Sequence, residues 1–208
     1  DGQISYQDRF GDFDFNTNLV FSYAKNRVDY KAEAQQKYPW LAETGKPLNQ
    51  PFGYKWIGYY TPEDITKIQS GAPDAPATPY TDIPVQAGDL KYADLNNDGT
   101  IDDYDKGAIG KPNLPSTTLG WSFGGYWRGF SFNVLFQGSF DYSFAINGTG
   151  IESFKSQFQP IHTSRWTLER YQNGEEIAFP RLTTNPSTIN SASTYMSDFW
   201  LINAWYIR

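Results

Sequence analysis

The amino-acid sequence predicts an all-β fold in which about four or five antiparallel strands form part of the wall of a transmembrane β-barrel, joined by very long extracellular loops. Three observations support this prediction. Aromatic residues make up 18% of the 208 residues, a composition that favours strands over helices. Several segments alternate apolar and polar residues over the length that a barrel strand needs. The connections between them are alternately very short and very long, as on the two rims of a membrane barrel.

Three segments show the alternation most clearly. Residues 13–24 carry Phe, Leu or Tyr at nearly every odd position, and residues 118–127 and 130–137 repeat the pattern with Trp and Phe. A period of two places the bulky side chains on one face of a strand and the small or polar ones on the other. Residues 4–8 and 198–208 predict two further strands, the second with weaker alternation.

The connections divide the chain into five parts. Two turns, at residues 10–11 and 128–129, are tight, and we place them on the periplasmic rim. The predicted order is two barrel strands with a tight turn (1–25), a long extracellular loop (26–116), a barrel hairpin (117–142), a second long extracellular loop (143–197) and the start of a further barrel strand (198–208). In the first loop, residues 61–68 predict a short helix, because Thr61 can cap it and Pro62 suits its first turn.

Composition and charge exclude several classes of protein. The net charge of -6, without any basic run, removes the electrostatic attraction on which nucleic-acid binding depends. The absence of Cys excludes a disulfide framework, a thiolate metal site and a cysteine nucleophile. No apolar run approaches the roughly 18 residues of a membrane helix, whereas barrel strands show only alternation.

One motif has a specific chemistry, that of a calcium loop. Residues 94–105 place oxygen-bearing side chains at loop positions 1, 3, 5, 9 and 12, Gly at position 6 and an apolar residue at position 8. The predicted ligands of a structural Ca²⁺ are Asp94, Asn96, Asp98, the main-chain carbonyl of Thr100, Asp102 and Asp105. Asp105 replaces the usual Glu at position 12, which opens the site to competition from Mg²⁺. The flanks do not resemble the paired helices of a calcium sensor, so the predicted ion pins a long exterior loop. The alternative is a solvated turn rich in Asp and Asn.

Weaker signals come from loop aromatics and from the only histidine. Loop aromatics can stack on sugar rings or on apolar ligand surfaces, and the candidate ligand contacts are Trp40, Tyr59, Tyr60, Trp166 and Tyr171. The alternative is that these rings hold the long loops together. His162 is expected to be a polar loop residue, and no catalytic residues are predicted, so the chain is not expected to be an enzyme.

Short motifs follow one another along nearly the whole chain: FSYAKN at 21–26, TGKP at 44–47, GYYTPEDI at 58–65, GDLKYAD at 88–94 before the calcium loop, IGKP at 109–112, RGF at 128–130, RWT at 165–167 and FPRL at 179–182. Their order resembles the C-terminal barrel region of the SusC/RagA-type TonB-dependent (TonB-linked) outer-membrane transporters. The resemblance implies a barrel of about 22 strands with an N-terminal plug, in the outer membrane of a Gram-negative bacterium.

The same resemblance implies a function and partners. Such a transporter imports oligosaccharide or peptide fragments together with a SusD-like surface lipoprotein. It is surrounded by outer-membrane lipid, and TonB would act through an N-terminal region that these residues lack. Because five strands cannot close a barrel and an open sheet edge aggregates, the 208 residues are expected to belong to a longer polypeptide or to lie against further chains.

Two other classes of function stay open from the sequence. The first is a secreted, calcium-stabilised β-sandwich that binds carbohydrate, whose apolar strand faces would pack against a second sheet. The second is a surface hydrolase, for which adjacent acids such as Glu175 and Glu176 give little support, because glycosidase chemistry needs two carboxylates on opposite sides of a cleft.

Overall fold

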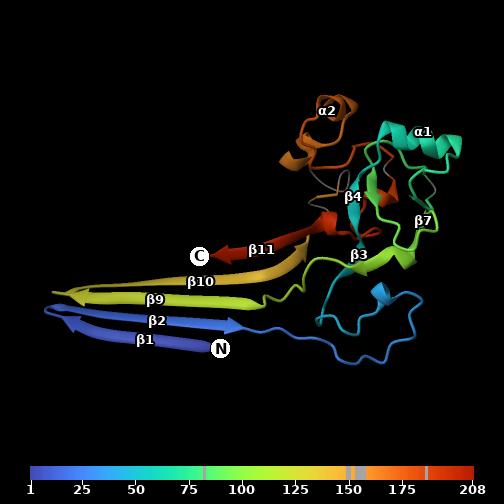
Figure 1. Ribbon diagram of the computed structural model, residues 1–208. Coiled ribbons are helices and arrows are strands. Elements are labelled where there is room, and N and C mark those ends of the chain that lie inside the picture. Colours follow the sequence, from blue (N-terminus) through green and yellow to red (C-terminus); the bar gives the residue numbers. More distant parts are fainter. Residues whose placement is uncertain (82, 149–150, 153–157, 186) are drawn as a thin grey trace.

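The computed structural model describes residues 1–81, 83–148, 151–152, 158–185 and 187–208. Five long strands form one sheet, and the remaining elements gather at one end of it (Figure 1). We call this second part, residues 24–116 and 146–200, the loop body. The fold is all-β with antiparallel sheets, as predicted, apart from one short parallel pair. None of the described helices is long and apolar enough to cross a membrane.

The predicted strands are all present in the sheet. Their spatial order is β1 (Gly2–Phe10), β2 (Phe13–Tyr23), β9 (Thr117–Trp127), β10 (Phe130–Ala145) and β11 (Leu201–Ile207), each antiparallel to its neighbours. Three boundaries differ from the prediction. The strand expected at 4–8 is longer, and the one expected at 198–208 begins only after a 3₁₀ turn at Asp198–Trp200. β10 continues to Ala145, beyond the end of the hairpin expected at 117–142.

The two tight turns lie together at the end of the sheet that is farthest from the loop body (Figure 1). Gly11, Arg128 and Gly129 have φ angles of 63°, 43° and 92°, the left-handed conformation that short hairpin turns require. The Arg128 guanidinium contacts the Asp12 carboxylate at 2.9 Å and so ties one turn to the other. Short connections therefore occupy one end of the sheet and long ones the other.

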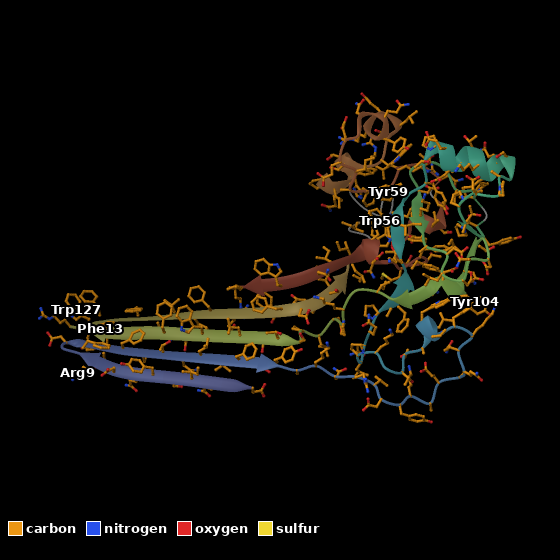
Figure 2. The ribbon with its side chains drawn as sticks, viewed as in Figure 1. Arg9, Phe13, Trp56, Tyr59, Tyr104 and Trp127 are labelled. Atoms are coloured by element: carbon orange, nitrogen blue, oxygen red, sulfur yellow. The ribbon has the colours of Figure 1, made fainter. Side chains whose placement is uncertain are left out.

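One face of the sheet, which we call the aromatic face, carries rows of bulky side chains. Phe13 pairs with Trp127 at the turn end (Figure 2), and Trp127 pairs in turn with Phe130. Nearer the middle, the rings of Trp121 and Phe136 stack with centroids 5.8 Å apart. Phe130 is 77% exposed and Trp127 51% exposed. Their apolar surface thus has no cover from the described part of this chain.

The opposite face, which we call the polar face, carries mainly small and polar side chains. Asn16, Gly124 and Asn133 share one row of the register, and Asn18 and Ser122 pair in another. The β-sandwich alternative requires a second sheet against the aromatic face. Among the described residues no such sheet covers it, because the other sheets are two-stranded and lie in the loop body.

In its described residues the loop body contains short paired strands, the helices α1 and α2, and several 3₁₀ turns. The strand pairs are β3 (Phe52–Tyr54) with β8 (Lys106–Ala108), β4 (Trp56–Tyr59) with β6 (Leu90–Tyr92), and β5 (Thr78–Pro79) in parallel with β7 (Thr100–Ile101). The helices are α1 (Pro62–Ser70) and α2 (Leu168–Asn173), and the other 3₁₀ turns are Pro39–Leu41, Asp103–Asp105, Pro160–Ser164 and Thr188–Asn190.

Helix α1 confirms the helix predicted at 61–68. The Thr61 hydroxyl accepts from the Asp64 N–H at 3.1 Å, and the Asp64 carboxylate accepts from the Thr61 N–H at 3.0 Å. This reciprocal pair satisfies two free N–H groups at the helix start. Gly71, with a φ of 65°, ends the helix in the left-handed conformation. Both ends of α1 are therefore fixed by residues in or next to the helix itself.

The hydrophobic core of the described residues lies in the loop body and not on the sheet. Tyr60, Leu90 and Ile189 are fully buried, and Tyr92 and Ile101 are nearly so. Tyr92 donates from its hydroxyl to the Ile189 carbonyl at 2.8 Å, a contact between the first long loop and the second. The two loops thus fold against each other as one packed unit.

A buried carboxylate, that of Asp89, joins the same two loops. It is 0% exposed and receives a charged hydrogen bond from the Arg181 guanidinium at 2.6 Å and another from the Asn190 side-chain amide at 2.8 Å. Its second oxygen accepts from the Gln86 N–H at 2.8 Å. A buried charge is tolerated only when its lone pairs are used in this way.

Replacing Asp89 by Asn in the intact polypeptide should strongly destabilise the loop body. The change leaves the Arg181 charge, whose side chain is only 14% exposed, without its counter-ion, and breaking a buried pair from one side costs about 3–5 kcal/mol. Thermal unfolding and the rate of proteolytic cleavage in the loops would measure the loss of stability. Asp74→Asn is the matched control, because the Lys67–Asp74 pair is well exposed and its removal should change stability by less than about 1 kcal/mol. Equal stability of the two variants would contradict this account.

Candidate functional site

The calcium-type loop lies between β6 and β8 and includes the short strand β7 and the 3₁₀ turn Asp103–Asp105. It turns sharply at two residues with positive φ, Asn97 at 58° and Gly99 at 85°. Gly adopts this conformation freely and Asn more readily than most residues. The predicted position of the sharp turn is therefore confirmed.

Backbone N–H groups of the loop point at its own carboxylates and amides. Asp94 accepts from the Gly99 N–H at 2.8 Å, Asn96 from the Asp98 N–H at 3.0 Å, and Asp98 from the Thr100 N–H at 2.9 Å. These bonds hold the side-chain oxygens toward the inside of the turn. Thr100 itself lies in β7, in register with Thr78.

The last two predicted ligands close the loop. Asp105 is fully buried, accepts from the Leu95 N–H at 2.7 Å and from the Asp102 N–H at 2.9 Å, and burial raises the pKa of its carboxyl. Asp102 accepts from the Tyr104 N–H at 2.7 Å. A buried acid whose charged form is disfavoured gains from a nearby cation.

The donor set fits a hard cation, since it consists of carboxylate, amide and main-chain oxygens. Within the described part of the chain, however, no group of three or more His, Cys, Asp or Glu side chains is already arranged as a metal site. The hydrogen bonds thus bring the six predicted ligands into one closed loop, but their side chains are not yet arranged around an ion. Ion binding stays a prediction.

Trp40, a predicted ligand contact, lies beside this loop. Its indole N–H donates to the Tyr104 carbonyl at 2.7 Å, and its ring stacks on Tyr38 with centroids 4.6 Å apart. Lys37 lies over the Tyr104 ring, 4.4 Å from its centroid. The cluster fastens the segment around Trp40 to the calcium-type loop. Part of the Trp40 surface remains accessible.

Tyr59 and Tyr60, two predicted ligand contacts that are adjacent in the chain, differ in their burial. Tyr60 is 0% exposed, its hydroxyl donates to the Ala77 carbonyl at 2.6 Å, and burial raises the pKa of that hydroxyl. Tyr60 is therefore a core residue and offers no surface to a ligand. Tyr59 is half-buried, and its ring packs edge-on against that of Trp56 with centroids 5.6 Å apart (Figure 2). It also packs edge-on against Phe199, with centroids 6.3 Å apart.

Trp166 and Tyr171 hold the second loop against the first. Their rings lie 6.0 Å apart. A Cβ placed on Gly88 would come within 2.5 Å of the Trp166 ring, so Trp166 packs directly on the backbone of the first loop. The Tyr171 hydroxyl donates to the Glu63 carboxylate at 3.2 Å, which links α2 to α1. The contacts of Trp166 and Tyr171 are those expected of rings that hold the long loops together, the alternative to ligand binding.

His162 is buried, whereas the sequence suggested an ordinary polar loop position. It is 3% exposed, its Nδ1 accepts from the Gln159 N–H at 2.8 Å, and its Nε2 lies 2.8 Å from the Ile151 carbonyl. Because Nδ1 accepts, Nε2 carries the proton and donates. Both ring nitrogens are used in holding the loop.

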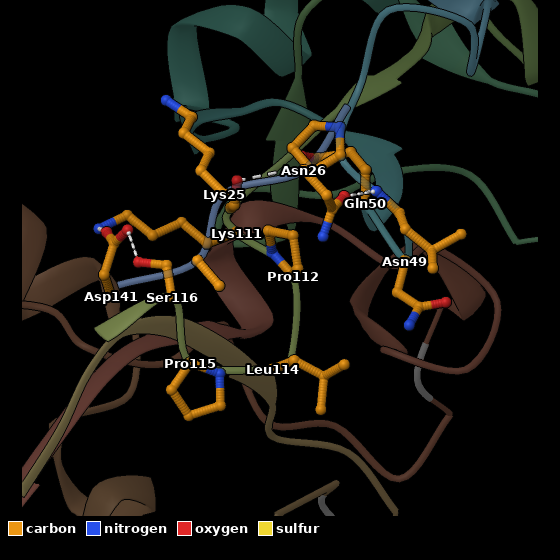
Figure 3. A pocket seen from close by; sticks show the side chains of 14 residues that line it. Lys25, Asn26, Asn49, Gln50, Lys111, Pro112, Leu114, Pro115, Ser116 and Asp141 are labelled. Atoms are coloured by element: carbon orange, nitrogen blue, oxygen red, sulfur yellow. Dashed lines mark hydrogen bonds and ion pairs between the residues drawn. The ribbon is translucent and has the colours of Figure 1, made fainter. Parts of the chain in front are cut away.

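Two cavities that the sequence did not indicate lie near the rim where the sheet meets the loop body. The first, of about 430 Å³, is lined by three prolines and two leucines together with polar side chains, and the Lys111–Asp141 ion pair closes one side of it (Figure 3). The second, of about 380 Å³, is lined by Trp40, Lys46 and Lys55 among others. No local sequence pattern marks either cavity, because each is assembled from several segments.

Comparisons with known proteins show the fold. No protein-family model matches the chain, and no curated protein sequence matches it significantly. Among solved structures, a chain of the RagAB peptide transporter is 15% identical with a TM-score of 0.60, covering 99% of this chain and 21% of that chain. A chain of the RagAB peptide importer in the open-open state is 13% identical with a TM-score of 0.63, covering 99% of this chain and 20% of that one. The closed-closed state gives 15% identity, a TM-score of 0.60 and the same 99% of this chain against 21% of the other. The chain thus spans about a fifth of the length of these neighbours and shares the fold of that segment.

Proposed function

We propose that the chain is part of a SusC-like TonB-dependent importer in the outer membrane of a Gram-negative bacterium, which takes up peptide or glycan fragments together with a SusD-like lipoprotein. The observation that carries the proposal is a sheet whose aromatic face is uncovered, while the packed core of the described residues lies in the loops at one end. A water-soluble domain places its core on the sheet instead.

Strand length fits a membrane wall. β2 and β9 have 11 residues each and β10 has 16. At about 3.3 Å per residue, and with the tilt of about 45° that barrel strands have, 11 residues cross roughly 26 Å of hydrocarbon. Ring side chains at the turn end, including Phe10, Phe13, Trp127 and Phe130, would form the aromatic belt of the periplasmic interface.

The proposed partners are assigned to the two faces of the sheet and to the loop body. In this proposal the aromatic face meets lipid, the polar face meets the plug, and the loop body stands outside the membrane, where it contacts the substrate and the lipoprotein. The neighbours' description as peptide transporters favours peptides among the substrates. TonB would act on an N-terminal region of the longer polypeptide, and the chain performs no bond chemistry.

Labelling of two adjacent residues on β10 tests the membrane part of the proposal. Phe132 lies on the aromatic face and Asn133 on the polar face. In the intact polypeptide, freed of any other cysteine and placed in lipid vesicles, a spin label on Phe132→Cys should collide mainly with oxygen, which concentrates in hydrocarbon. The label on Asn133→Cys should show much lower oxygen accessibility. Preferential collision of the Phe132→Cys label with a water-soluble nickel complex would exclude a lipid-facing wall.

Uptake is tested separately, in a strain that lacks the gene for the intact polypeptide. Growth on peptide mixtures or oligosaccharides as the only carbon source should fail for the true substrate class and return when the gene is restored. Deletion of residues 26–113, most of the first long loop, should abolish growth while the barrel still reaches the outer membrane. Unimpaired growth on every peptide and glycan mixture would rule out import as the function.

We infer that the loop at residues 94–105 binds a structural Ca²⁺, with Mg²⁺ as a competitor. Asp94→Ala should weaken Ca²⁺ binding about tenfold or more, because the loss of one carboxylate lowers the ligand charge. Calorimetry on the intact polypeptide measures this, with the exposed Asp74→Ala as the control. Chelation should speed proteolysis between Asp94 and Asp105 in the wild type. Unchanged cleavage after chelation would argue against a structural ion.

A further inference from the structure

The cavity of about 380 Å³ beside the calcium-type loop has a composition that suits a particular ligand. Six separate segments build it. Trp40 comes from the 3₁₀ turn Pro39–Leu41, Lys46 from the irregular chain after it, Lys55 from the link between β3 and β4, Leu95 from position 2 of the calcium-type loop, and Gly107 from β8; the sixth segment is the 3₁₀ turn Asp198–Trp200. Asp198 completes one side.

The two lysines of this cavity are unusual within the described chain. Five other lysines form ion pairs with carboxylates, at positions 31, 67, 91, 106 and 111. Lys37 lies over aromatic rings. Of the lysines that the structure describes, Lys25, Lys37, Lys46 and Lys55 have no carboxylate within ion-pair distance, and two of these four line one cavity.

The cavity keeps a net positive charge although the chain has a net charge of -6. Its one acid, Asp198, uses Oδ1 to accept the Trp56 N–H at 2.7 Å and caps the start of β4. Two lysines thus line the cavity together with a single carboxylate, one oxygen of which already accepts a hydrogen bond. Unpaired like charges at one concavity repel each other, and an anionic ligand would relieve that repulsion.

The remaining walls are apolar and leave room. Tyr38 stacks on Trp40, and the Trp40 N–H is taken by the Tyr104 carbonyl, so the free part of the indole is apolar surface. A Cβ on Gly107 would meet only Leu95, at 3.7 Å, so the space beside Gly107 is bounded by an apolar side chain. An apolar wall with a few charged groups is the usual make-up of a small-ligand pocket, and the volume lies within the usual range.

We propose that this cavity binds the carboxylate of an acidic substrate fragment, with Lys46 and Lys55 as its ion-pair partners and Trp40 as the wall for its apolar part. The inference rests on the proposed import function and names the substrate class. An acidic peptide and a glycan that contains uronic acid both carry this chemistry, so the experiment has an arm for each.

The test uses the intact polypeptide in detergent and measures binding by calorimetry. The peptide arm compares triglutamate with triglutamine, and the glycan arm compares trigalacturonate with trigalactose. In the arm of the true source, the acidic probe should bind about tenfold more tightly than its neutral counterpart, since each partly exposed ion pair contributes about two- to fivefold. This preference should fall as ionic strength rises.

Two lysine variants assign the preference to the cavity. In Lys46→Met/Lys55→Met the preference for the acidic probe should disappear while the neutral probe binds as before. Lys25→Met is the matched control, because Lys25 is also without an ion-pair partner but lies outside this cavity. In Lys46→Glu/Lys55→Glu the preference should reverse toward trilysine. An unchanged melting temperature excludes misfolding as the cause.

Three results would overturn the inference. Equal binding of acidic and neutral probes to the wild type is one, and retention of the preference in the double Met variant is another. The third is a loss of affinity for the lipoprotein in that variant with probe binding intact, which would make the lysines a partner contact. A transporter that still imports neutral fragments in all three cases would keep the proposed function and lose only the acidic substrate class.

Discussion

The buried carboxylate of Asp89 is the constraint on which the loop body depends. Removing a carboxylate from water costs several kcal/mol, and only a full set of donors makes its burial tolerable. Arg181 and Asn190 supply two of those donors from the second long loop, and Gln86 supplies a third from the first. Arg181 also donates its backbone N–H to the Gly88 carbonyl. Two segments about a hundred residues apart are thereby fixed in one relative position.

This constraint explains how such long connections become ordered. The core that forms around Tyr60, Leu90 and Ile189 is made by both loops together, so neither loop can bury its apolar residues alone. The sheet contributes little to that core, and its aromatic face remains exposed, as the proposed contact with lipid requires. A division of this kind, with packing in the loops and exposure on the strands, is the reverse of that in a water-soluble β-domain.

The loop body also brings chemistry together at one place. The calcium-type loop is closed by its own hydrogen bonds, and Trp40 donates to the Tyr104 carbonyl within it, so the segment that carries Trp40 is fastened to that loop. Leu95, at the second position of the loop, forms a wall of the cavity that Lys46 and Lys55 line. The calcium-type loop and the cavity therefore share Leu95.

The sequence by itself determined the elements that depend on local chemistry: strands through their period of two, α1 through the Thr61–Asp64 capping box, and the turn of the calcium-type loop through Gly99. Helix α2 has an equally local signal in Thr167 and Gly174, but it spans only six residues. Only the tertiary structure decided that Tyr60 and His162 are buried, that Asp89 pairs with Arg181, and that Lys46 and Lys55 share a cavity. Those outcomes join residues far apart in the chain, and burial and pairing at such distances depend on how whole loops pack, which no short pattern encodes.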